Sequence, residues 1–218
     1  GRIYIMNIDH CNTHSSFKDM VRMSNLCQEI TLPTVPIQHI DDNEGEIALC
    51  ILSAINVGKV RSDKELEELC DLSVRGLEEL IDYQRYPVIA AETATKARRS
   101  LGVGFIGLAH YLARLGFNYD SQEAWDAVHG LSESFQYYLL KSSNEIAKEK
   151  GACEYFDRTK YADGILPIDT YKKDVDEISS EELQHDWDSL RTSIATHGLR
   201  HSTLSAQMPS ESSSVVSN

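Results

Sequence analysis

Ile47-Ala48-Leu49-Cys50-Ile51-Leu52, followed by Ala54 and Ile55, is the stretch of sequence that decides the fold class. A short, nearly continuous apolar run is typical of a strand buried on both faces, although periodicity alone does not exclude a buried helix. We therefore predict a strand over 47–56. Similar short apolar stretches predict further strands near 2–8, 28–32 and 203–207.

Helical patterns separate these strands. Ser62-Asp63-Lys64-Glu65 has the form of a capping box, and apolar residues recur behind it at helical spacing to about Tyr83. Further helices are predicted over 93–115, over 120–150 with a glycine cap, and over 180–196. Helices that alternate with buried strands indicate an α/β fold, and the pattern does not distinguish an open sheet from a barrel.

Length and charge narrow the class of protein. The 218 residues suit one domain or a large part of a bigger one, and both ends look abrupt, so we expect a fragment. A net charge of -13 argues against nucleic acid as a partner, but a helix start can still bind a small phosphorylated ligand. The sequence has no membrane-length apolar stretch and no leader pattern, so we expect a cytoplasmic protein without membrane contact.

The five cysteines are scattered, odd in number and without a Cys-x-x-Cys pair, which argues against a disulfide framework and a four-thiolate zinc site. Cys70 and Cys153 are predicted to be buried, inert thiols. The stretch Asp9-His10-Cys11-Asn12-Thr13-His14 gathers possible metal ligands, but no second ligand pair accompanies it. We interpret it as a polar loop and predict no metal ligands.

Gly102-Val103-Gly104-Phe105-Ile106-Gly107 matches the dinucleotide-binding pattern G-x-G-x-x-G. That pattern binds a pyrophosphate when a buried strand precedes it and a helix follows it. Here the preceding residues 95–100 are polar and basic with a helical pattern, and no strand ending in Asp or Glu follows about twenty residues later. We therefore interpret the glycines as points of close helix packing rather than as a nicotinamide-cofactor site.

Asn25, Cys27 and Glu29 alternate along the chain. In an extended segment, side chains two residues apart point to one face, so carboxamide, thiol and carboxylate would converge there. Such a set offers an orienting hydrogen-bonding group, a sulfur that exchanges one hydrogen, and a general base. Such an alternation often arises by chance. The residues around it are what support interpreting these three as a catalytic set.

Ser24-Asn25-Leu26-Cys27-Gln28-Glu29-Ile30, followed by Leu32-Pro33-Thr34, resembles the active-site finger loop of the large catalytic subunits of class I ribonucleotide reductases. Further blocks resemble the same family in order along the chain, at 45–50, 82–87, 98–104, 136–141, 164–173, 197–204 and 208–213. The resemblance implies that residues 1–218 are part of the catalytic barrel domain. It implies a portion of a ten-stranded α/β barrel with the finger loop through its centre.

The resemblance also implies roles in the reduction of ribonucleotides to deoxyribonucleotides for DNA replication. Cys27 would become a thiyl radical and abstract the 3′ hydrogen of a ribonucleoside diphosphate, Glu29 would take the 3′-hydroxyl proton, and Asn25 would hydrogen-bond the substrate. Cys50 would be one half of the dithiol that reduces the radical intermediate. The substrate-binding residues carried over are Asn25, Leu26, Cys27, Gln28, Glu29, Pro209, Ser210, Glu211, Ser212 and Ser213.

The last five of these residues match a segment that binds the substrate phosphates. Serine hydroxyls and free N–H groups at a helix start suit an anion. Family members often have Thr at the position of Ser212, which keeps the hydroxyl. The glycine pattern at 102–107 falls within a helix of the family, according to the same resemblance.

The resemblance implies no directly bound cofactor. The radical would come from a metal cofactor in a separate small (beta) subunit, and thioredoxin or glutaredoxin would serve as the external dithiol reductant. The cysteine that pairs with Cys50, the ATP-binding allosteric region, the radical-relay tyrosines and the C-terminal cysteines have no match in this chain. We therefore expect the isolated chain to be inactive.

Two other functions remain open from the sequence. The chain could be a non-catalytic product of a split gene that acts only after assembly with complementary polypeptides. It could instead be a nicotinamide-dependent oxidoreductase that uses Gly102–Gly107, which a cofactor titration would test.

Overall fold

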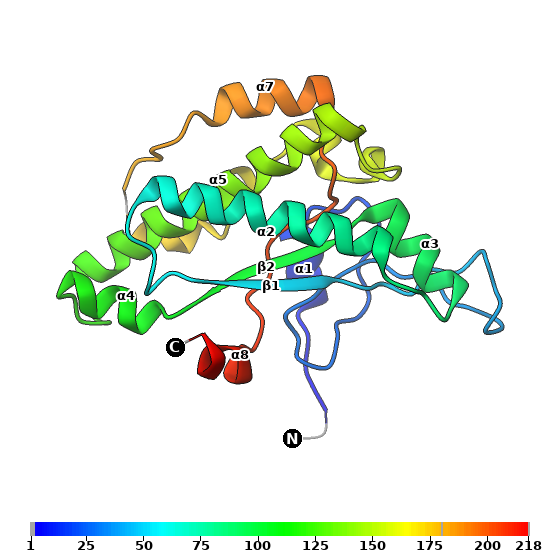
Figure 1. Ribbon diagram of the computed structural model, residues 1–218, viewed down its shortest axis with the longest axis horizontal. Coiled ribbons are helices and arrows are strands. Elements are labelled where there is room, and N and C mark those ends of the chain that lie inside the picture. The colour runs from blue at the N-terminus through cyan, green and yellow to red at the C-terminus, as the bar shows by residue number, and fades with distance from the viewer. Residues whose placement is uncertain (1–2, 180, 218) are drawn as a thin grey trace.

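The computed structural model describes residues 3–179 and 181–217 (Figure 1). The elements follow the chain as α1 (Ile8–His14), β1 (Ile51–Asn56), α2 (Asp63–Tyr83), α3 (Ile89–Arg98), β2 (Leu101–Ile106), α4 (Leu108–Leu115), α5 (Gln122–Lys150), η1 (Phe156–Arg158), η2 (Lys160–Asp163), α6 (Pro167–Thr170), η3 (Lys173–Glu177), α7 (Trp187–His197) and α8 (Glu211–Val216). Among these helices we find none that is both long and apolar enough to cross a membrane.

The sheet has two strands, and their pairing confirms the α/β class. β1 and β2 run parallel, with Ile51 opposite Leu101 and Asn56 opposite Ile106, and α2 and α3 form the crossover between them. A third segment joins the free edge of β2 through one parallel bridge from Val103 to Ser205. The sheet is therefore open, as a portion of an α/β barrel would be.

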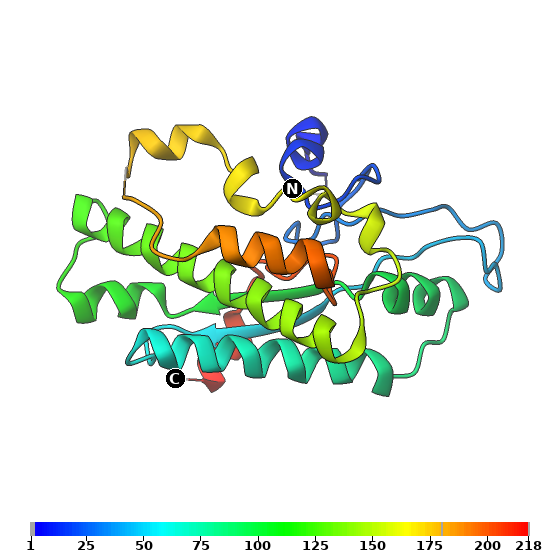
Figure 2. The ribbon, with the colours of Figure 1, turned by 90° about the horizontal axis from the view of Figure 1, so that it is seen from above.

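The two faces of the sheet differ in what covers them. Ile55, Leu101 and Val103 belong to the main core, which α2, α5 and α7 complete. In Figure 1, α2 and α5 lie on one side of the strands and α8 lies on the other, and Figure 2 shows α2, α5 and α7 side by side over the sheet. The main hydrophobic core thus occupies one face and leaves the opposite face to loops and α8.

Local capping explains the long helices. The Ser62 hydroxyl accepts a hydrogen bond from Glu65 N–H at 3.2 Å, so α2 begins and ends where the sequence predicts. α5 ends at Lys150, and Gly151 takes a positive φ of 85° as the predicted glycine cap. α7 starts at Trp187 rather than near residue 180, because the Asp186 side chain caps it. Residue 180 itself lies outside the described residues.

The prediction of one helix over 93–115 is wrong. α3 ends at Arg98, residues 101–106 form strand β2, and α4 begins at Leu108. Glycine is a poor helix former, and the apolar residues between the glycines alternate with the period of a strand. Gly102–Gly107 is therefore not part of a helix, contrary to the expectation from the family resemblance.

Several predicted strands are absent or shorter. Residues 3–7 and 28–32 form no strand, and residue 2 is not among the described residues. β1 covers only 51–56 of the predicted 47–56, and 203–207 contributes a single bridge. The stretch from Asp9 to His14 is helical, in α1, where we predicted a polar loop. Short apolar stretches do not form strands without a partner strand for their backbone hydrogen bonds.

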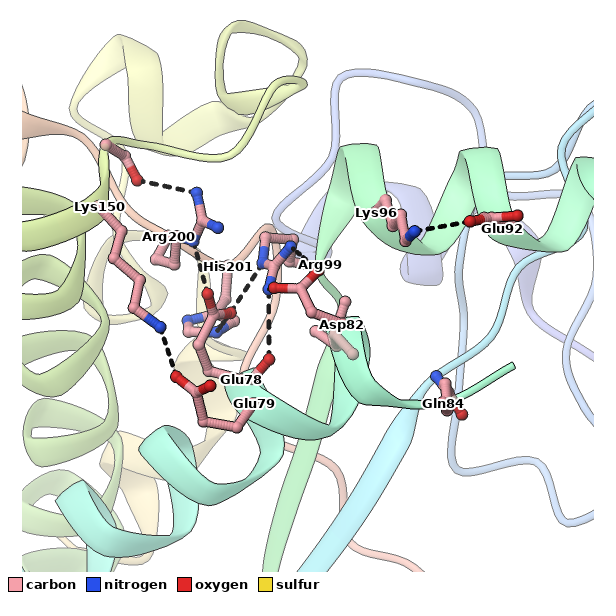
Figure 3. A network of polar contacts seen from close by, with 12 residues as sticks. Glu78, Glu79, Asp82, Gln84, Glu92, Lys96, Arg99, Lys150, Arg200 and His201 are labelled. Atoms are coloured by element: carbon pink, nitrogen blue, oxygen red, sulfur yellow. Dashed lines mark hydrogen bonds and ion pairs between the residues drawn. The ribbon is translucent and has the colours of Figure 1, made fainter. Parts of the chain in front are cut away.

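One buried carboxylate joins three parts of the chain. Glu78 of α2 is 1% exposed and accepts hydrogen bonds from Arg99 Nε and Arg200 Nε, each at 2.7 Å, and from His201 Nε2 at 3.0 Å (Figure 3). Burial opposes its ionisation, but the hydrogen bonds from His201, Arg99 and Arg200 outweigh burial and hold the pKa of Glu78 well below its usual value. This carboxylate fixes the start of β2 and residues 200–201 against α2.

We expect Glu78→Gln to lower the free energy of unfolding of the intact protein by about 3–5 kcal/mol, because it leaves buried cations without their counter-charge. Glu79→Gln is the matched control: the Glu79 side chain is 73% exposed and pairs with Lys150, so the loss should stay below about 1 kcal/mol. Urea denaturation measures both. An equal loss of unfolding free energy in the two variants would show that Glu78 does not stabilise the fold more than an exposed carboxylate does.

The same site predicts a pH dependence. The folded-state pKa of Glu78 is depressed, so its contribution is present above the unfolded pKa of about 4.5 and is lost as pH falls further. Burial also lowers the pKa of His201, so the unfolded state takes up this proton first and stability falls below about pH 6.5. Denaturation between pH 8 and about pH 2 should show both losses, and Glu78→Gln should remove the more acidic one. An acid-insensitive wild type would contradict this.

Candidate functional site

The face of the sheet opposite the main core carries the predicted site. Alternation along the strands sets even-numbered residues on this face. A Cβ atom added at Gly102 would lie 2.5 Å from Leu52 Cδ2 and 2.8 Å from Cys50 Sγ, which places Cys50 on it. Strand alternation and the short distances at the glycines together place six residues on this face. They are Cys50, Leu52, Ala54, Asn56, Gly102 and Gly104.

The two strand glycines allow a later part of the chain to cross this face closely. A Cβ atom at Gly104 would lie 2.4 Å from the carbonyl oxygen of Ala206 and 3.0 Å from Met208 Sδ. The predicted close packing through these glycines is therefore present, but between β2 and residues 206–208 rather than between helices. Residues 101–106 lie within strand β2, whereas the dinucleotide-binding pattern places its glycines in a turn between a strand and a helix.

The thiol Cys27 lies in a turn, and the extended arrangement expected for residues 25–29 is wrong. Gln28 N–H donates to the carbonyl oxygen of Asn25 at 3.2 Å, and Gln28 has a left-handed φ of 67°. A turn does not point alternate side chains to one face, so the alternation does not bring the three groups together. We call residues 24–30 the cysteine turn.

The predicted substrate-binding side chains of the cysteine turn differ in their exposure to solvent. Leu26 is 79% exposed, and Cys27 and Gln28 are exposed beside it, so the thiol lies open at the tip. Asn25 and Glu29 are half-buried at the base. The turn thus presents the sulfur outward and keeps the carboxamide and the carboxylate closer to the sheet.

Glu29 and Cys50 are the two predicted catalytic groups that influence one another. Burial, with the charge of Glu29 as the second cause, raises the pKa of the Cys50 thiol to about 12, so this sulfur keeps its proton at neutral pH. Glu29 Oε2 is buried and has no hydrogen-bond donor among the described residues. An unpaired buried carboxylate oxygen is costly, and it is a suitable acceptor for a ligand hydroxyl.

The predicted phosphate-binding segment leads into α8. Pro209 and residues 211–213 are exposed, and no side chain caps the helix. Ser214 N–H is bonded back to the Ser210 carbonyl, so the N–H groups of residues 211–213 lie ahead of the helix's own hydrogen bonds. Asn56 Nδ2 donates to the Ser217 carbonyl at 3.3 Å, which joins α8 to the end of β1.

The structure therefore brings the site together only in part. The charge of Glu29 acts on the Cys50 thiol, and α8 lies on the same side of the sheet as Cys50 (Figure 1). Within residues 3–179 and 181–217, no hydrogen bond joins the cysteine turn to α8. No group of three metal-ligating side chains occurs in the same ranges.

Sequence reasoning missed how four positions shape the site. Gly102 and Gly104 make room for residues 206–208, Met208 covers Gly104, and Ser24 closes the cysteine turn through Ile30. Glycine at two alternate positions between apolar residues was the available signal for a strand crossed closely by another segment. Nothing in the sequence around Ser24 indicated its partner. Cys70 and Cys153 are buried as predicted, and burial raises the pKa of each to about 12.

Comparisons with known proteins agree on one family. The family model described as the ribonucleotide reductase barrel domain matches residues 1–218. The chain is 60% identical to ribonucleoside-diphosphate reductase subunit alpha of Haemophilus influenzae, 58% to ribonucleoside-diphosphate reductase 1 subunit alpha of Escherichia coli, and 44% to subunit alpha of Enterobacteria phage T4. Each match covers 100% of this chain but 29% of the relative's length.

We expect Gly104→Ala to lower the free energy of unfolding of the intact protein by about 1–3 kcal/mol, because the new methyl group collides with the Ala206 backbone. Gly130→Ala is the control: nothing lies within 4 Å of its added Cβ, and alanine should stabilise α5 by up to about 1 kcal/mol. Thermal denaturation measures both. An unchanged free energy of unfolding in Gly104→Ala would show that residues 206–208 do not pack closely against β2.

Proposed function

The chain belongs to the ribonucleotide reductase barrel-domain family, and on that premise we propose that it supplies the thiol, the carboxylate and the phosphate-binding segment of a ribonucleoside-diphosphate reductase active site. The observation that carries this proposal is the position of Cys27 at the open tip of the cysteine turn, with Cys50 on the strand face and within the influence of the Glu29 charge. The overall reaction converts a ribonucleoside diphosphate and a dithiol into the 2′-deoxyribonucleoside diphosphate, a disulfide and water.

Cys27 is assigned the hydrogen-atom transfer. Its sulfur radical takes the 3′ hydrogen of the ribose, so an S–H bond forms, a C3′–H bond breaks and the radical moves to carbon. The 2′-hydroxyl then takes a proton from one thiol of the dithiol and leaves as water, and at the end of the cycle the 3′ hydrogen returns from the Cys27 thiol. An exposed sulfur suits this role, because the ribose must approach it directly.

Glu29 is assigned the role of general base. The 3′-hydroxyl proton moves to its carboxylate as the 2′-hydroxyl departs. The unpaired, buried Oε2 atom supports this role, since a substrate hydroxyl would supply the hydrogen-bond donor that the described residues do not. Asn25 is assigned to hold the ribose by hydrogen bonding.

Cys50 is assigned one half of the reducing dithiol. The two thiols together give two electrons and two protons and become a disulfide. A pKa of about 12 keeps the Cys50 sulfur protonated at neutral pH, which supports delivery of its hydrogen rather than early loss of a proton to water. The second cysteine of the pair is proposed to lie outside this chain.

The segment of Pro209, Ser210, Glu211, Ser212 and Ser213 is assigned to the diphosphate. The N–H groups of residues 211–213 at the start of α8 support this assignment, because such donors stabilise an anion by hydrogen bonding without a basic patch. Leu26 and Gln28 are assigned to the substrate side of the cysteine turn.

The remaining parts of the proposed enzyme lie outside the chain, which spans 29% of the length of the relatives that it matches. We propose a radical-generating small (beta) subunit with a metal cofactor, and thioredoxin or glutaredoxin as the external reductant. A split gene product would use the same geometry after assembly with complementary polypeptides. Flanking reading frames distinguish the two cases, since an uninterrupted frame excludes a split gene.

Cys27→Ser in the intact large subunit should abolish deoxyribonucleotide formation, because a serine hydroxyl does not form the radical at the same potential. Product should fall by more than about a thousand-fold. Cys11→Ser, which changes a half-buried cysteine in α1, should retain activity. The assay measures reduction of a ribonucleoside diphosphate with the small subunit, effector and dithiol. Turnover by Cys27→Ser would refute the assignment.

The isolated 218-residue chain should form no product in the same assay, because we place the partner of Cys50 and the effector-binding region outside it. The intact subunit at equal concentration is the positive control. Measurable reduction by the isolated chain would contradict the proposed distribution of the site.

A further inference from the structure

The cysteine turn is closed by hydrogen bonds to one residue. Ser24 Oγ donates to the Ile30 carbonyl oxygen at 2.7 Å, and Ile30 N–H donates to Asn25 Oδ1 at 3.2 Å. Both backbone polar groups of Ile30 are therefore bonded to side chains on the other arm of the turn. Cys27 lies midway between the two arms, so these bonds fix the ends of the segment that carries the thiol.

Ile30 is itself anchored. Its side chain packs against the small core of Phe17, Val21 and Leu32, where Cys50 packs as well. The bonds from Ser24 and Asn25 thus connect the cysteine turn to the same cluster that holds Cys50. The position of Cys27 relative to Cys50 depends on this connection.

The turn needs such support because its backbone is strained. Gln28, next to Cys27, has a φ of 67°, and this left-handed region is strained for a residue other than glycine. Such a conformation persists where the surrounding structure holds it in place. The Asn25 carbonyl bond to Gln28 N–H and the two bonds to Ile30 provide this support.

The same bonds orient the Asn25 carboxamide. Its Oδ1 accepts from Ile30 N–H and lies 3.4 Å from Ser24 Oγ, which leaves the Nδ2 group without an acceptor among the described residues. The orientation of an amide follows from its hydrogen-bond partners. Asn25 is therefore held as a hydrogen-bond donor toward a ligand oxygen.

We propose that Ser24 is a positioning residue of the active site: its hydroxyl, through Ile30 and Asn25, holds the strained turn that presents Cys27 and keeps Asn25 Nδ2 free to donate to the substrate. The inference rests on the proposed function, because it assigns Ser24 an effect on the chemistry of Cys27. It goes further, because Ser24 touches neither the substrate nor the reacting atoms.

The test compares three variants of the intact large subunit, assayed with its small subunit, effector and dithiol. Ser24→Ala removes the hydroxyl, and Ser24→Thr keeps it. Ser16→Ala is the matched control, because Ser16 Oγ also donates to a backbone carbonyl, that of Ser202 at 2.8 Å, away from the cysteine turn. Ser24→Ala should lower kcat by about 10- to 100-fold, the effect of a misplaced reacting group.

A positioning role also predicts what should not change. Ser24→Ala should leave KM within about threefold and the Tm no lower than that of Ser16→Ala, whereas Ser24→Thr and Ser16→Ala should keep kcat within about threefold of wild type. Hydrogen exchange at the Gln28 and Ile30 amides should be at least about tenfold faster in Ser24→Ala alone. Wild-type kcat in Ser24→Ala, or an equal loss of kcat in Ser16→Ala, would overturn the proposal.

Asn25→Asp separates the two roles of the asparagine. A carboxylate still accepts from Ile30 N–H but has no Nδ2 donor, so amide exchange in the cysteine turn should stay slow while kcat falls by at least about tenfold. Fast exchange or wild-type kcat in this variant would overturn the donor assignment. Cys27→Ser distinguishes the two levels of inference: an active Cys27→Ser refutes the proposed function, whereas an inactive one with a normal Ser24→Ala refutes only the role of Ser24.

Discussion

The buried carboxylate of Glu78 is the interaction on which the rest of the structure depends. It holds Arg99 at the start of β2 and Arg200 and His201 before the third edge segment, so it fixes two neighbouring backbones against α2. The adjacent residue Arg98 turns to the other side and pairs with Glu46 at 2.7 Å and Asp19 at 2.9 Å. Two consecutive arginines thus connect the helical layer to the segments that carry the cysteine turn. Because a buried charge without a partner is costly, neither Arg98 nor Arg99 can move away from its carboxylate partners alone.

The site follows from this arrangement through the strand glycines. Once β2 and residues 200–201 are fixed, residues 206–208 must cross Gly102 and Gly104 at a distance that no side chain would allow. That crossing leads directly to Pro209 and α8, and it leaves Cys50 beside Gly102 on the same face. The position of the segment proposed to bind phosphate is therefore determined by backbone packing on β2, while Ser212 and Ser213 at its end remain exposed.

The sequence predicted well those elements whose signals are local. Ser62 and Gly151 mark helix ends by capping, and the bounds of α2 and α5 agree with them. The strand β2 was missed because its glycines hide the alternation of Leu101, Val103 and Phe105, and because its partners lie about fifty and a hundred residues away. The identities of Cys27, Glu29 and Cys50 came from family resemblance, and their placement required long-range packing. The turn at Asn25 to Gln28 contradicts the extended geometry because side-chain bonds to Ile30 outweigh strand preference.

The two predicted thiols show why placement matters more than residue type. Cys50 is half-buried next to a carboxylate, which stabilises the protonated sulfur, whereas Cys27 stands exposed on a turn with a left-handed residue beside it. A thiol that must meet a sugar carbon needs access, and one that must deliver hydrogen later needs protection from ionisation. The turn and the strand face provide these two environments within one small core cluster, which packs Ile30 and Cys50 together. The two thiol environments, and with them the separate roles proposed for Cys27 and Cys50, thus follow from how one short loop is closed against one sheet face.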